Sequence, residues 1–88
     1  MAYQVVFTDA AKRSSHELPA HIRKRVGRWI DLLAEEPRRP GTRQLQGYPH
    51  IRRAHAGKDY VILYTIIPEQ MTVIVLGVEN RRDVYRRL

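Results

Sequence analysis

Residues 50–59, which read HIRRAHAGKD, combine side chains suited to proton transfer and to anion binding. The stretch holds two histidines, two arginines, a lysine and an aspartate. Histidine is the side chain whose ordinary pKa lies nearest to neutrality, so it can give or take a proton at physiological pH. The planar guanidinium of arginine matches phosphate and carboxylate groups. The stretch therefore predicts acid–base chemistry at a bound anion.

The overall charge points to an anionic partner. The chain has 88 residues, with 16 Lys and Arg against 9 Asp and Glu, and a net charge of +7. From Pro37 to Lys58 there are six Lys and Arg and no acidic residue. A polyanion such as nucleic acid and an acidic protein both fit this charge, and a basic surface that serves only solubility is the alternative.

Composition also excludes several kinds of site. The chain contains no cysteine, which rules out disulfides, thiolate metal sites and thiolate nucleophiles and fits a reducing cytoplasm. The four histidines form no metal-binding pattern, so we expect neither a metal nor another cofactor. The N-terminal residues are not a signal peptide, and no apolar run approaches the roughly 20 residues of a membrane span. We expect a cytoplasmic protein without a membrane partner.

The first half of the chain predicts a strand followed by two helices. Residues from Tyr3 to Thr8 are β-branched and aromatic, which is typical of a strand. Thr8 and Asp9 can cap a short helix, and Pro19 suits the first turn of a second one. Apolar residues recur in the second helix at spacings of three and four, namely Ile22, Val26, Trp29, Ile30 and Leu33. The two helices should form an antiparallel hairpin.

The second half predicts strands joined by tight turns. The expected strands are Arg43 to Gln46 at an edge, Ile51 to Ala56, Tyr60 to Ile67 and Met71 to Val78. The third of these is apolar on both faces and should be central. The ending ENRRDVYRRL predicts a short helical or extended tail. The whole is one α+β domain, residues 1–88, with an N-terminal strand, a helical hairpin and a mainly antiparallel sheet of three to four strands.

The element order and two phrases of the sequence resemble the RelE/ParE superfamily of bacterial toxins, with the RelE/YafQ-like branch favoured. The phrases comprise Leu45 with Gly47, Ile51-Arg52, Asp59-Tyr60 with Tyr64, and Val78 to Tyr85. The likeness covers nearly the whole chain and implies the RelE/ParE-like fold. It also implies one of two activities, ribosome-dependent cleavage of mRNA without a metal or poisoning of DNA gyrase. Either kind of toxin is held inactive by an acidic antitoxin.

For a nuclease, the resemblance implies a set of site residues. His55 would be the general acid or base, and Asp59 would orient it and raise its pKa. Arg52 and Arg81 would hold the phosphate, and Tyr85 would stack on a base or move a proton. The residues expected to contact RNA are Arg53, Lys58, Arg82 and His50. His50 is also an alternative acid or base, and Arg82 is an alternative to Arg81.

Two features conflict with this set. Val61 and Ala54 stand where many RelE-like toxins carry cations. Arg52 and His55 are three residues apart, so on a regular strand they point to opposite faces. Both can reach one substrate only if the strand bulges or ends near Gly57.

The leading hypothesis is therefore an mRNA interferase that inhibits translation, with the ribosome, mRNA and an acidic antitoxin as partners. Basic residues outside the motif would contact ribosomal RNA, namely Arg23, Lys24, Arg28, Arg38 and Arg39. The alternatives are a ParE-like gyrase inhibitor and a degenerate toxin that binds only its antitoxin. We expect no direct sequence-specific DNA binding, because in such complexes the antitoxin reads the DNA.

Overall fold

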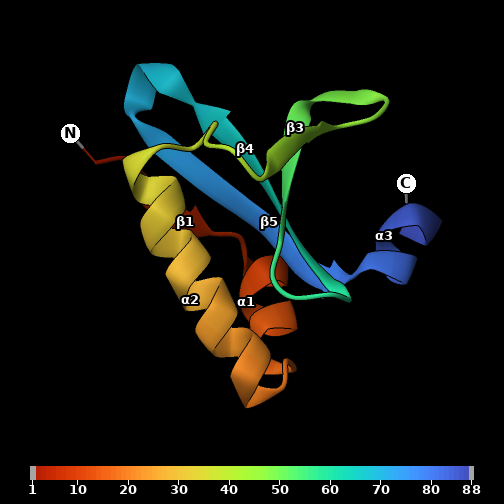
Figure 1. Cartoon of the computed structure of the whole chain (residues 1–88). Coiled ribbons are helices and arrows are strands. Elements are labelled where there is room, and N and C mark those ends of the chain that lie inside the picture. Colours follow the sequence, from red (N-terminus) through yellow and green to blue (C-terminus); the bar gives the residue numbers. More distant parts are fainter. Residues whose placement is uncertain (1, 88) are drawn as a thin grey trace.

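One sheet, with two helices on one of its faces, organises the chain (Figure 1). The computed structural model describes residues 2–87, and it describes side chains up to residue 84. The elements in chain order are β1 (Gln4–Phe7), α1 (Asp9–His16), α2 (Ala20–Glu35), β2 (Thr42–Leu45), β3 (Tyr48–His55), β4 (Tyr60–Ile67), the 3-10 turn η1 (Pro68–Gln70), β5 (Thr72–Asn80) and α3 (Arg81–Arg87). The predicted α+β class and element order are confirmed.

The sheet has five strands in the order β1-β5-β4-β3-β2. β1 runs parallel to β5, and the other neighbours are antiparallel. β4 is the middle strand, which confirms the prediction from its apolar sequence. Gly57, between β3 and β4, has a φ of +96°, and a Cβ there would lie 3.3 Å from Ile22 Cδ1. This turn therefore requires glycine on both conformational and steric grounds.

The two N-terminal helices lie side by side and antiparallel on one face of the sheet (Figure 1). Thr8 caps α1, because its Oγ1 accepts a hydrogen bond from the Ala11 amide at 3.1 Å. α2 buries the predicted stripe at Ile22, Val26 and Leu33. These side chains pack on the inner residues of β3, β4 and β5, among them Ala54, Ile62, Tyr64, Val73, Val75 and Val78.

The structure extends two of the predicted strands and shows which form the tail takes. β3 begins at Tyr48 rather than Ile51, and β5 continues to Asn80. The tail is the helix α3, of the two forms that the sequence left open. Asn80 starts this helix, because its Oδ1 accepts a hydrogen bond from the Arg82 amide at 3.0 Å.

A register shift in β5 keeps its inner face apolar along its length. Leu63 pairs with Gly77, whereas the next residue, Tyr64, pairs with Val75, so Leu76 is an extra residue in β5. Because of this bulge, Val75 and Val78 both join the core although they are three positions apart.

Replacing Tyr64 by Phe should destabilise the fold. Tyr64 is fully buried, and its hydroxyl donates a 2.6 Å hydrogen bond to the Pro37 carbonyl, which ties β4 to the segment after α2. The change leaves that carbonyl without its donor, at a cost of about 1–3 kcal/mol. Urea unfolding measures it. Tyr60→Phe is the control, since within the described part of the chain the Tyr60 hydroxyl makes no hydrogen bond. An equal loss of stability in both variants would contradict this account.

Candidate active site on the open face of the sheet

The face of the sheet opposite α1 and α2, here called the open face, carries the predicted histidine. Ala54 on β3 and Ile62 on β4 are fully buried beneath the helices. Side chains alternate along a strand, so the neighbours of these two residues point the other way. On β3 those neighbours are Arg53 and His55. They pair with Leu63 and Val61 of β4.

These side chains surround a pocket of about 210 Å³, here called the histidine pocket. Its floor is apolar, since Leu45, Val61 and Val84 are each no more than 3 % exposed. Its polar groups come from one strand and one helix and are Arg53 and His55 of β3 and Arg81 of α3. An apolar floor beneath two guanidinium groups and an imidazole suits a phosphodiester, because charge–charge interactions strengthen where water is displaced.

Arg81 enters the pocket because the β3–β4 turn holds the first residue of α3. The Arg81 amide donates a 2.8 Å hydrogen bond to the carbonyl of Asp59. Val84, one helical turn later, is buried and packs α3 against the open face. A main-chain contact and an apolar anchor thus position the guanidinium of Arg81.

Three effects lower the pKa of His55 below its ordinary value of 6.5. Desolvation is the largest, followed by the positive charges of Arg53 and Arg81. His55 is exposed at the mouth of the pocket, so one side of the ring stays open to a ligand. The imidazole is therefore neutral at neutral pH and can accept a proton.

The expectation that Asp59 raises the pKa of His55 is wrong. The pKa is lowered, and Asp59 is not among the causes. The Asp59 side chain is exposed and lines a neighbouring hollow of about 400 Å³ with Lys58, Asn80, Arg81 and Arg82. Its contact with the site is the carbonyl that holds the Arg81 amide.

Arg52 lies on the other face of the sheet. β3 pairs with β4 without a bulge from Arg52 to His55, so these two side chains diverge. The Arg52 Nη2 donates a 2.8 Å hydrogen bond to Thr42 Oγ1, and its buried Nε has no partner among the described residues. The structure therefore brings Arg53, rather than Arg52, together with His55 and Arg81.

The remaining predicted residues are dispersed. Lys58 and Arg82 share the hollow beside Arg81. His50 is exposed, five residues before His55, which corresponds to about 16 Å along an extended strand. Tyr85 belongs to α3, but its side chain lies outside the described residues.

One basic residue near the site escaped the sequence analysis. Arg43 of β2 pairs directly with Arg53, and it lines a second hollow of about 300 Å³ with Gly41, Arg53 and His55. The spacing of Arg53 and His55, two residues apart on one strand, is a signal that could have identified Arg53 as the neighbour of the histidine. Finding Arg43 required the register of the β2–β3 hairpin.

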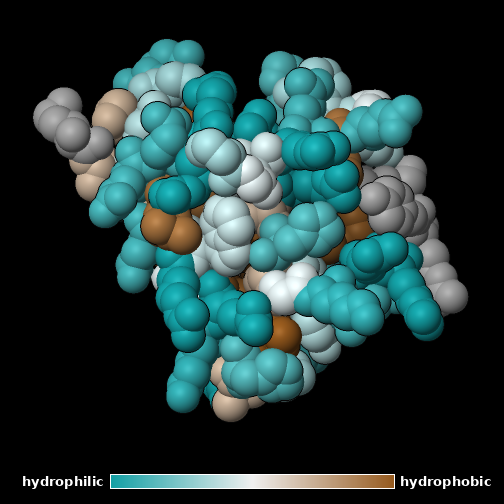
Figure 2. Space-filling model, in the orientation of Figure 1, coloured by the Kyte–Doolittle hydropathy of each residue, from teal (hydrophilic) through white to brown (hydrophobic). Residues whose placement is uncertain are grey.

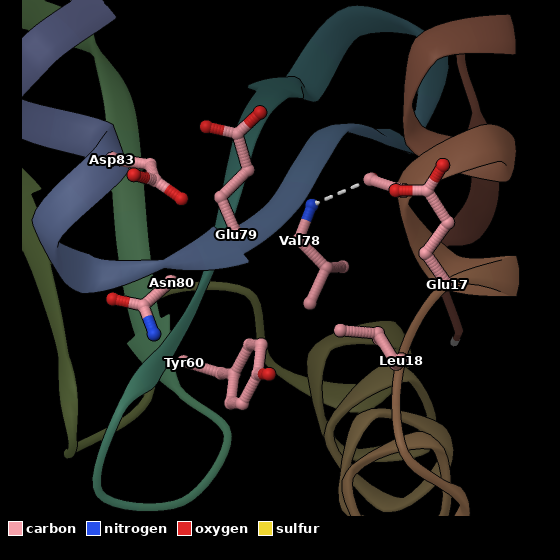
Figure 3. A pocket seen from close by; sticks show the side chains of 8 residues that line it. Glu17, Leu18, Tyr60, Val78, Glu79, Asn80 and Asp83 are labelled. Atoms are coloured by element: carbon pink, nitrogen blue, oxygen red, sulfur yellow. Dashed lines mark hydrogen bonds between the residues drawn. The ribbon is translucent and has the colours of Figure 1, made fainter.

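A larger cavity, of about 480 Å³, lies between α1, β5 and α3 and is acidic. Figure 3 shows Glu79 and Asp83 on one side of it and Glu17 on the other, with Leu18 and Tyr60 below. Val78 lines it as well, and its amide donates a 3.2 Å hydrogen bond to Ser14 Oγ. Three carboxylates repel a phosphate. This cavity is therefore unsuited to an anionic ligand.

Within the described residues, no three side chains of His, Cys, Asp or Glu come together as a metal site. In the same part of the chain, none of the helices combines the length and the apolar character needed to cross a bilayer.

Comparisons with known proteins agree on one family. The model of the ParE toxin of type II toxin–antitoxin systems matches residues 5–85. Toxin RelG of Mycobacterium tuberculosis is 40% identical over 91 residues, which cover 99% of this chain and 100% of RelG. A chain of the RelBE2 toxin–antitoxin complex of the same organism aligns with a TM-score of 0.78 and 33% identity, over 92% of this chain and 93% of that one.

The fold also matches that of the isolated RelE toxin of E. coli. The TM-score is 0.78 over 99% of this chain and 100% of RelE, at 23% identity, so this likeness concerns the fold alone. The family match and the identity to RelG carry the assignment. The chain belongs to the RelE/ParE superfamily and is a toxin of a type II toxin–antitoxin system.

Proposed function

We propose that this toxin is a ribosome-dependent endoribonuclease that cuts mRNA without a metal and thereby inhibits translation. The observation that carries the proposal is the histidine pocket, which an imidazole of lowered pKa shares with two guanidinium groups. The 40% identity to the relative named RelG supports the RelE branch of the superfamily.

His55 is the general base in this mechanism. Its neutral ring takes the proton of a ribose 2′-OH, and the 2′-oxygen attacks the adjacent phosphorus. Desolvation, Arg53 and Arg81 keep the imidazole unprotonated in the free enzyme, where a base must be. The low pKa weakens the base, but bound phosphate offsets part of the arginine charge and raises the pKa as the proton arrives.

Arg53 and Arg81 stabilise the phosphorane. The attack adds negative charge to the phosphoryl oxygens, and two guanidinium groups in place before the reaction hold this charge without reorganising. They come from β3 and α3 and approach the pocket from different elements. Val61 places an apolar side chain beneath them, so the cationic clamp is smaller than that of many RelE-like toxins.

The leaving 5′-oxygen requires a proton, and Tyr85 of α3 is the candidate donor. The O2′–P bond forms as the P–O5′ bond breaks. The products are a 2′,3′-cyclic phosphate and a 5′-hydroxyl end. Two reasons favour Tyr85 as this donor. It belongs to the family motif, and it follows the buried Val84 directly on α3.

The partners follow from charge and from the related complexes. Several exposed basic residues lie outside the pocket, on α2 and in the segment that follows it. They would contact ribosomal RNA and include Arg23, Lys24, Arg28 and Arg38. Polar side chains cover most of the surface seen in Figure 2, with apolar residues as isolated spots. An acidic antitoxin would bind this basic chain, as toxin and antitoxin form a complex in RelBE2.

Inhibition of DNA gyrase is the second candidate, because the matching family model is described as ParE. A toxin that acts by binding gyrase has no need of a general base. The two functions therefore differ in whether His55 is required.

Replacing His55 by Ala should abolish mRNA cleavage. Loss of a general base lowers the rate by about 10²- to 10⁴-fold. His55 is exposed, so the fold should be unaffected. Primer extension on an mRNA, with and without translating ribosomes, measures the cuts for the wild type, His55→Ala and Tyr85→Phe.

His21→Ala is the matched control, because His21 is exposed on α2, on the other side of the sheet. It should cut like the wild type. An active His55→Ala variant would exclude the general-base role. A wild type that makes no cuts but blocks supercoiling by gyrase would replace the nuclease with the gyrase inhibitor.

Replacing Arg81 by Gln should raise the pKa of His55 toward 6.5 without reaching it, because desolvation and Arg53 remain. An NMR titration of the His55 Cε1–H resonance measures both midpoints. The pKa of His55 is lower in the folded state than in the unfolded state. At pH values between these two pKa values, the folded state therefore binds fewer protons than the unfolded state. The fold should lose stability as the pH falls below about 6.5, because His55 must then be protonated in its unfavourable folded environment. A wild-type midpoint at or above 6.5, or no change in Arg81→Gln, would contradict the assigned electrostatics.

A further inference from the structure

We propose that Arg43 and Arg53 form a second phosphate subsite, which holds the nucleotide next to the cleaved bond. The inference rests on the proposed nuclease function and adds Arg43 to the substrate-binding residues. In this proposal the bound RNA crosses the open face of the sheet from α3 toward the edge strand β2.

The register of the β2–β3 hairpin places the two arginines together. Arg43 and Arg53 are Cα partners on antiparallel strands, so their Cβ atoms are about 4.5–5.5 Å apart on one face. Guanidinium groups at the ends of such neighbouring side chains can hold one phosphate from two sides. Arg43 is exposed at the sheet edge, where a chain of nucleotides can leave the surface.

Two hollows meet at the shared residues. The histidine pocket, of about 210 Å³, and the hollow of about 300 Å³ at Arg43 are both lined by Arg53 and His55. Arg81 contributes only to the first of these two hollows and Arg43 only to the second. A phosphate beside His55 and a neighbouring phosphate beside Arg43 therefore occupy adjacent hollows along a continuous path.

The two strands of the hairpin lie in a basic stretch of the chain. From Pro37 to Lys58 there are six Lys and Arg and no acidic residue. The charge of this stretch therefore favours an anionic ligand.

Arg43→Gln tests the proposal, with Arg13→Gln as the charge-matched control. Arg13 is exposed on α1, across the sheet from both hollows. The probe is a short single-stranded RNA, protected from cleavage by 2′-O-methyl groups and followed by fluorescence anisotropy at several salt concentrations. Arg43→Gln should bind about tenfold more weakly, and the slope of log K against log salt should fall by about 0.7, the value for one lost phosphate contact. Arg13→Gln should match the wild type.

Kinetics of mRNA cleavage on translating ribosomes distinguish a failure of the subsite from a failure of the proposed nuclease function. Arg43 holds the substrate in the ground state and the transition state alike, so Arg43→Gln should raise KM and leave kcat unchanged. If the wild type cuts mRNA and Arg43→Gln matches Arg13→Gln in affinity, salt slope and KM, the subsite is excluded and the nuclease stands. If the wild type neither binds the RNA nor cuts mRNA, the proposed function fails and the subsite fails with it.

Discussion

Ala54 and Ile62 lie opposite each other on β3 and β4, and both are fully buried beneath the helices. Because side chains alternate along a strand, this apolar pair decides which face each neighbouring residue occupies. A shift of one residue would bury Arg53 and His55 in the core and expose the alanine. Burial of β3 and β4 against α2 therefore also places an arginine and a histidine on the open face.

The same arrangement explains why the site combines basic groups with buried apolar side chains. The open face has an apolar floor of strand and α3 residues, and the cations stand at its rim. Desolvation and the charges of Arg53 and Arg81 lower the pKa of His55, so in the proposed mechanism the free imidazole can accept a proton and a bound anion would change its pKa. The cavity between α1, β5 and α3 is acidic and would repel an anion, so the distribution of charge favours the histidine pocket for an anionic ligand.

The sequence was most informative where local pattern and global fold agree. The apolar stripe of α2 and the apolar run of β4 predicted a buried helix and a central strand, and both are confirmed. Arg52 shows where the reasoning failed, since a family motif favoured it although its parity placed it away from His55. The choice between Arg52 and Arg53 required knowing that β3 is regular where it pairs with β4. Two contacts of the site leave no local signal in the sequence. The hairpin register pairs Arg43 with Arg53, which are 10 positions apart. The main-chain hydrogen bond from Arg81 to Asp59 joins residues that are 22 positions apart.

The central claim is that His55 acts on a ribose 2′-OH at the open face. The most direct measurement uses an mRNA with a single 2′-deoxynucleotide at the cut position, incubated with the toxin on translating ribosomes, and mass spectrometry of the ends produced. The account predicts that the unmodified mRNA gives a 2′,3′-cyclic phosphate and a 5′-hydroxyl and that the deoxy-substituted position is not cut. Cleavage at the deoxy position, or ends that carry a 5′-phosphate, would contradict it.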